Sequence, residues 1–150
     1  MNTVLAQGIT AIVDRDIRVF TTVAALNAAG FDFELAPQYH PVREQVRAHL
    51  ESLETDLRTR LGEFYREHKG DEADGAQLAK YVSLALSLTD PPTMEFAFDE
   101  EFVPPDAREL AGFVPLLREF YLKAGVTQLW SRLRFQYEET LDVMGPALRE

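Results

Sequence analysis

The sequence predicts an all-α protein, and three features support that fold class. Apolar residues recur at intervals of three and four along most of the chain, which is typical of one face of an α-helix. Glycines such as Gly30, Gly70 and Gly125 follow these stretches, where helices commonly end. Strand-like alternation is confined to a short run, Met94, Phe96 and Phe98. We therefore expect residues 1–150 to form a single domain of about five helices, with an irregular acidic segment near 90–106.

The first helix is expected from about residue 15 to about residue 29. Asp14 or Asp16 precedes it and is a suitable N-cap, and Gly30 follows its last turn. Its apolar positions follow the helical period: Ile17, Phe20, Val23, Ala24 and Leu26.

Residues 41–69 carry the strongest helical pattern in the chain. One apolar stripe runs along them: Val42, Val46, Leu50, Leu53, Leu57, Leu61 and Phe64. Opposite charges stand four residues apart on the other faces: Arg47 with Glu51, Glu54 with Arg58, and Asp56 with Arg60. Pro41 suits the first turn, and Gly70 follows the last. These features predict one continuous helix of about 28 residues, or about 42 Å.

The run AQLAKYVSLALSLTD, residues 76–90, is nearly all apolar. Composition alone allows a buried strand or a buried helix. The alanines, the length and the scarcity of β-branched residues favour a buried helix. The sequence DPP at 90–92 ends it, because a proline disfavours the α conformation of the residue before it.

Another helix is expected over residues 107–124. Asp106 is a suitable N-cap, and the pair Pro104–Pro105 excludes helix just before it. Pro115 lies inside the apolar pattern, so we expect a break near Gly112–Val114.

A last helix is expected over residues 128–144, capped by Thr127 and ended by Gly145 and Pro146. Its buried face is Leu129, Trp130, Leu133, Tyr137 and Leu141. The remaining residues, PALRE, resemble the first turn of a further helix. We therefore expect the chain to be a fragment of a longer protein.

Composition and charge argue against several classes of function. The chain has no cysteine, which rules out disulfides, thiol nucleophiles and cysteine-bound zinc. Its net charge of −10 disfavours a nucleic-acid partner, because phosphate binding needs a basic surface. No apolar stretch is long enough to predict a membrane span. The acidic excess is concentrated in residues 71–109, with ten acidic and two basic side chains, either as solvated surface or as a docking face for a basic or metal-bearing partner.

The stretch HPVREQVRAHL, residues 40–50, holds two histidines and a glutamate and raises the question of zinc. Two histidines on one helix bind zinc when they are four residues apart, so that both rings leave the same face. His40 and His49 are nine apart, about half a turn out of phase, and Glu44 faces away from His49. No H-E-x-x-H motif is present in the chain. We therefore predict no metal ligand, cofactor or catalytic residue here.

The stretch FDEEF, residues 98–102, is the most informative connection in the sequence. Its three adjacent carboxylates suit a hard cation such as calcium, but three neighbours in sequence rarely converge on one ion. The simpler interpretation is a set of exposed acids on a loop that Phe96, Phe98 and Phe102 anchor to the core. The alternative is a loop that docks a neighbouring domain, with these candidate interaction residues: Phe96, Phe98, Asp99, Glu100, Glu101 and Phe102.

Several segments together resemble the amino-terminal helical region of poorly characterised bacterial gluzincin-like zinc metallopeptidases. These segments are DIRVFTTVAALNAAGFD, HPVREQVRAHL, SLALSLTDPPTMEF and LAGFVPLLREFYLKAGVTQLWSRLRFQYEE. In that family the H-E-x-x-H helix lies beyond the region matched here, so no zinc ligand carries over. The resemblance implies a helical module that packs on a protease-like domain, with zinc only in a longer parent. It also implies an exported bacterial parent protein.

Three functional hypotheses follow from the sequence. The leading one is the non-catalytic helical part of a zinc-metallopeptidase-like protein, which shapes or packs on a protease-like domain and exposes an apolar patch. The second is a stand-alone interaction module that binds a protein partner through its acidic 71–109 face. The third is an enzyme that uses Asp99, Glu100 or Glu101. We rank it last, because nothing in the sequence assembles a nucleophile, a base and a stabilising group.

Overall fold

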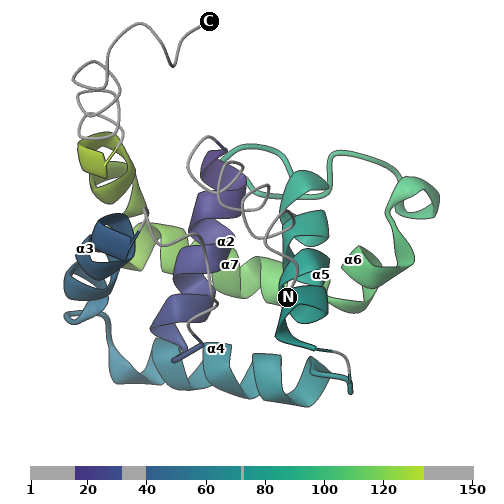
Figure 1. Cartoon of the computed structure of the whole chain (residues 1–150). Helices are drawn as coiled ribbons and strands as arrows, with labels where there is room; N and C mark the ends of the chain where they lie inside the picture. The colour runs from purple at the N-terminus through teal and green to yellow at the C-terminus, as the bar shows by residue number, and fades with distance from the viewer. Residues whose placement is uncertain (1–15, 32–39, 72, 134–150) are drawn as a thin grey trace, which may run out of the picture.

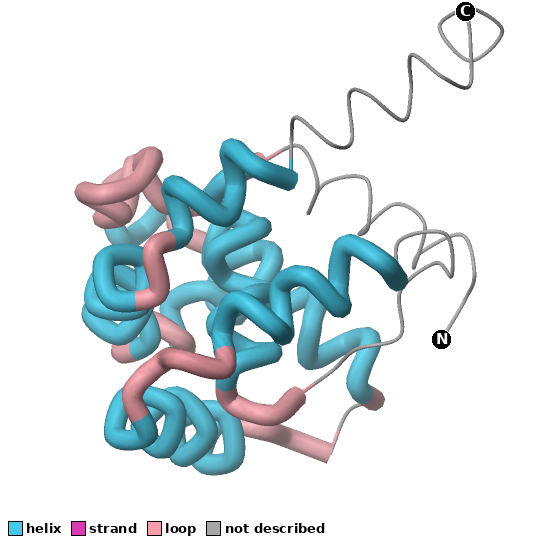
Figure 2. Tube along the Cα trace, turned by 90° about the vertical axis from the view of Figure 1, so that its left-hand side faces the viewer, coloured by secondary structure: helices cyan, strands magenta, loops and turns pink. Residues whose placement is uncertain are grey.

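A computed structural model of the chain describes residues 16–31, 40–71 and 73–133, without the side chains of 40–43, 74 and 100. The fold is all-α, as predicted, and Figure 2 shows the described chain as helices linked by loops. The α-helices are α2 (Ile17–Ala28), α3 (His40–Leu50), α4 (Thr55–His68), α5 (Asp74–Leu86), α6 (Pro105–Glu109) and α7 (Phe113–Lys123). A 3₁₀ helix, η2, covers Glu100–Phe102, and a further helix includes 126–133. Among the described helices, none has the length and apolar character needed to cross a membrane.

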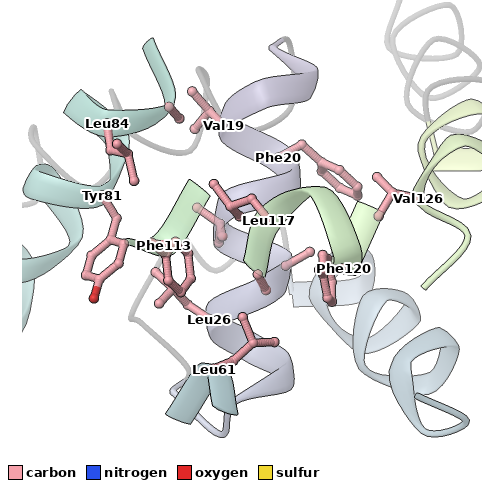
Figure 3. Packing of buried hydrophobic residues seen from close by; sticks show 14 of the residues in the cluster. Val19, Phe20, Leu26, Leu61, Tyr81, Leu84, Phe113, Leu117, Phe120 and Val126 are labelled. Atoms are coloured by element: carbon pink, nitrogen blue, oxygen red, sulfur yellow. The ribbon is translucent and has the colours of Figure 1, made fainter. Parts of the chain in front are cut away.

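Helix α2 is the centre of the fold. Every residue from Val19 to Leu26 is buried, so the helix is enclosed on all sides. It contacts α3, α4, α5 and α7, and Figure 1 shows these helices around it. Figure 3 shows core side chains from α4, α5 and α7 meeting those of α2, among them Leu61, Leu84 and Leu117.

The two buried hydroxyls of α2 are satisfied within the helix. The hydroxyls of Thr21 and Thr22 are buried and donate to the carbonyls of Ile17 and Arg18, at 2.7 and 2.9 Å. Burying a hydroxyl without a partner is costly, so these bonds allow threonine in the core.

Both predicted ends of the first helix are confirmed. The Asp16 side chain accepts hydrogen bonds from the backbone N–H groups of Arg18 and Val19. Gly30 follows the helix with φ +99°, a left-handed conformation that glycine adopts without steric cost. Burial by itself raises the pKa of the Asp16 carboxyl, but hydrogen bonds and charge from Arg18 offset this, and the pKa lies below its ordinary value.

The predicted continuous helix over 41–69 is wrong. The chain turns between α3 and α4, and Figure 1 shows α4 leaving the direction of α3 to run along one side of the molecule. Leu53 is buried in this turn, its N–H bonded to the carbonyl of Leu50 at 3.0 Å. The Arg58 guanidinium also donates to the Leu50 carbonyl, so a side chain satisfies the end of α3. The turn keeps the apolar stripe in contact with the core. A straight helix of about 42 Å would extend past the core and leave part of the stripe exposed.

The later helices confirm the expected types but not the expected caps. Residues 76–90 form a helix rather than a strand up to Leu86, and α6 and α7 are separate at Gly112, as predicted. However, α6 begins at Pro105, the position in a helix that tolerates proline, and no side chain caps it. Asp106 therefore lies inside the first turn rather than at the N-cap.

The predicted cap at Thr127 is also wrong. The helix that follows α7 begins at residue 126, so Thr127 lies within it. Its hydroxyl bonds to the phenol oxygen of Tyr121, at 2.6 Å. The predictions for Asp14, for Tyr137 and Leu141, and for the end at Gly145 and Pro146 fall outside the described residues.

Candidate functional site

The connection between α5 and α6 starts as a tightly held loop. Leu88 and Phe96 form an antiparallel bridge, and the Thr89 N–H donates to the Glu95 carbonyl at 2.8 Å. Met94 is fully buried at the tip. The Arg118 guanidinium of α7 donates to the Thr93 carbonyl at 2.9 Å. Contacts with the core and with α7 therefore fix this loop in place.

Beyond the bridge the chain protrudes into solvent, and we call residues 97–102 the aromatic loop. Phe98 is 53% exposed and Phe102 is 68% exposed. The η2 turn orders the loop, with the Phe102 N–H donating to the Asp99 carbonyl at 2.8 Å. Val103, only 3% exposed, then returns the chain to the core. Figure 1 shows this stretch at the edge of the molecule, on the side of α5 away from α3.

The structure separates the predicted interaction residues into two groups. Phe96 is partly buried and packs against the core, as an anchor should. Phe98 and Phe102 do not anchor the loop, and that expectation was wrong. Met94 and Val103, which are buried on either side of the two exposed rings, hold it instead. Asp99 and Glu101 are exposed, and the side chain of Glu100 lies outside the described part.

Leu86 is a further apolar residue beside this loop, and it was not singled out from the sequence. The Ala97 N–H donates to the Ser87 carbonyl at 2.9 Å, which extends the pairing of Leu88 with Phe96. Ser87 and Ala97 are therefore neighbours, and Leu86, the last residue of α5 just before Ser87, is 41% exposed. The sequence contains a pattern that could have indicated its exposure. The buried positions Leu78, Tyr81, Val82, Ala85 and Leu88 follow the helical period, and Leu86 does not lie on their face.

Three acids at the contact between α4 and α7 are compensated by ion pairs: Glu54, Asp56 and Glu119. Arg60 donates two hydrogen bonds to Glu119, each 2.7 Å long, and one to Asp56 at 2.9 Å. Lys123 donates to Glu119 at 2.7 Å and to Glu54 at 2.6 Å. Hydrogen bonds from Arg60, and then from Lys123, lower the pKa of Glu119 to about 2. This network joins α4 to α7 and compensates the acids that belong to it.

The acids around the aromatic loop differ from that network. Asp99, Glu101, Asp106 and Glu109 are all exposed. Within the described part of the chain, no ion pair engages any of the four. The exposed rings therefore lie on a segment whose negative charge is not neutralised by the fold.

His49 is the one histidine of the HPVREQVRAHL stretch whose side chain the structure describes, and hydrogen bonds hold its ring. The His49 ring bonds through Nε2 to the Ala124 carbonyl at 2.6 Å and through Nδ1 to Arg132 at 3.1 Å. His49 thus joins α3 to the end of α7, and the side chain of His40 is not described. No group of three metal-ligating side chains occurs among residues that the structure describes.

Comparison with known proteins leaves the family of the chain open. No protein-family model matches it, and no curated protein or solved structure does. Nothing in these comparisons links the chain to the gluzincin-like metallopeptidases, so that resemblance stays a prediction.

Proposed function

We propose that this chain is a non-catalytic helical interaction module, which docks on another protein surface through the aromatic loop. The observation that carries the proposal is the exposure of Phe98 and Phe102 between buried anchors. Fully burying a phenylalanine side chain contributes roughly 1.5–3 kcal/mol. Because both rings are more than half exposed in this fold, burial by a partner would still stabilise a complex. Aromatic side chains of this kind are common anchors of protein interfaces.

The attachment of the loop supports the same proposal. The bridge at Phe96 and the buried Val103 fix both of its ends, and η2 orders the residues between them. A contact surface that is already ordered loses less conformational entropy on binding. The two rings are therefore presented in a form suited to docking.

The docked surface is a downstream domain of the same polypeptide or a separate protein. In the first case, the docked surface is the protease-like domain that the sequence resemblance implies. In the second case, the chain is a stand-alone module and the docked surface belongs to a separate protein. Both use the aromatic loop in the same way. The metallopeptidase setting rests on the resemblance alone.

The test is quantitative co-purification of tagged full-length protein from its native cells. Phe98→Ala with Phe102→Ala should remove the partner, because together they delete both exposed rings. Leu122→Ala is the matched control, since Leu122 is 71% exposed on α7, outside the loop. A partner retained equally by all three proteins would contradict docking through this loop.

A further inference from the structure

We infer that the surface docked by the aromatic loop is a basic segment that also carries apolar side chains. This inference rests on the proposed function, because it assigns the chemistry of the partner at the same site. It follows from charge complementarity around the two exposed rings.

The exposed carboxylates of the loop are hydrated in this fold and are accessible to a cation that a partner supplies. Glu54, Asp56 and Glu119 are paired by Arg60 and Lys123. Asp99 and Glu101 are exposed and, in the residues described, engage no such cation. The fold thus pairs these three acids, while those of the loop, like Glu63 and Glu67 of α4, stay exposed; what sets the loop apart is that its acids lie beside two exposed rings.

Two rings flank three consecutive acids along the loop, so a partner that covers the loop meets both kinds of side chain. Asp99 follows Phe98, and Glu101 precedes Phe102. Leu86, next to the Ser87 that pairs with Ala97, adds exposed apolar surface near the start of the loop. Arginine and lysine fit such a surface, because their heads pair with carboxylates while their stems and charge pack against aromatic faces. Apolar side chains of the partner would cover the remaining ring surface.

A second copy of this chain does not meet that requirement. The chain has a net charge of −10, and two such loops in contact would bring like charges together. Juxtaposed like charges oppose association. We therefore assign the surface to a basic partner rather than to self-association.

The probe is a short synthetic peptide of arginine and leucine, titrated into the isotopically labelled full chain and followed by NMR. We expect the amide shifts to concentrate in residues 97–103. Phe98→Ala with Phe102→Ala should weaken binding about tenfold or more, and Asp99→Asn with Glu101→Gln should do the same. Affinity should also fall severalfold between about 0.05 M and about 0.5 M salt.

Two controls separate the loop from general acidity. Glu63→Gln with Glu67→Gln removes two exposed acids from α4 and should leave the affinity unchanged. A peptide of serine and leucine should bind far more weakly than the basic peptide. Equal weakening by the α4 substitutions, or shifts spread over all acidic surfaces, would overturn the inference.

The outcomes distinguish this inference from the proposed function. If the serine–leucine peptide binds residues 97–103 as well as the basic peptide does, the docking surface stands and the basic assignment is wrong. If neither peptide binds the loop and both ring substitutions leave co-purification unchanged, the proposed function fails as well. Sedimentation that shows dimers lost in Phe102→Ala would replace the basic partner by a second copy.

Discussion

Phe102 and Val103 are consecutive residues with opposite surroundings, since Phe102 is 68% exposed and Val103 is 3% exposed. The η2 turn ends between them, and the chain changes there from protruding loop to core. A larger apolar side chain is left in solvent while a smaller one is buried. Val103 therefore stabilises the fold by its burial, whereas Phe102 is exposed and available for contact with a partner.

Substitutions at these two positions should therefore differ greatly in their effect on stability. Val103→Ala should lower the free energy of unfolding by about 2 kcal/mol, because it removes buried methyl groups and leaves a cavity. Phe102→Ala should change it by less than about 0.5 kcal/mol. Urea denaturation followed by circular dichroism measures both. A large loss of stability in Phe102→Ala would show that the ring packs on the fold.

The ion-pair network of α4 and α7 predicts a specific dependence of stability on pH. The pKa of Glu119 falls from its ordinary 4.5 to about 2, because Arg60 and then Lys123 hydrogen-bond to the carboxylate. The folded chain thus holds this proton less tightly than the unfolded chain. The stabilisation is fully present above about pH 4.5 and is lost as the pH falls toward about 2.

Glu119→Gln tests this dependence through the melting temperature measured across pH. The variant should melt below the natural protein at neutral pH, and the gap should close as the pH approaches 2. Glu63→Gln, which changes an exposed acid of α4, is the control and should show no such gap. A gap that stays constant with pH would contradict a role for the Glu119 charge.

The cap of α2 should contribute measurably to stability because α2 is the central helix. Asp16→Ala removes the acceptor for the N–H groups of Arg18 and Val19 and should cost about 1 kcal/mol. Asp16→Asn keeps a side-chain oxygen at the same place and should retain most of that stability. Thermal unfolding compares the two variants. Equal losses would mean that the charge of Asp16, rather than the cap, stabilises the helix.

The turn between α3 and α4 should depend on Arg58. Arg58→Met keeps much of the apolar stem but removes the hydrogen bond to the Leu50 carbonyl, at a cost of about 1 kcal/mol. Amide exchange near the end of α3 should become faster than in the natural protein. Arg66→Met, at an exposed position of α4, is the matched control and should leave exchange there unchanged. Unaltered exchange in Arg58→Met would contradict this role.

Much of the helical architecture could be predicted from local patterns. Asp16 and Gly30 marked the limits of α2 because capping chemistry acts within a few residues. The turn at 51–54 could not be found in this way. Leu50, Leu53 and Leu57 keep the spacing of one helical face even though the helix is interrupted between them. Only the position of the core requires the chain to turn there.

The candidate surface was predicted in composition but not in orientation. The sequence singled out FDEEF, and its acids were expected to be exposed. It could not show which phenylalanines point inward, because η2 and the bridge at Phe96 set those directions through tertiary contacts. The compensation of Glu119 and the lack of it at Asp99 likewise depend on which helices pack together.

The central claim is that another domain or protein contacts the aromatic loop, and site-specific photo-crosslinking in native cells tests it most directly. A benzophenone amino acid would replace Phe102 in one protein and Leu122 in another, both highly exposed in the fold. We expect a discrete cross-linked product from position 102 and little or none from position 122. Equal products from both positions, or no product from position 102, would contradict a docking role for this loop.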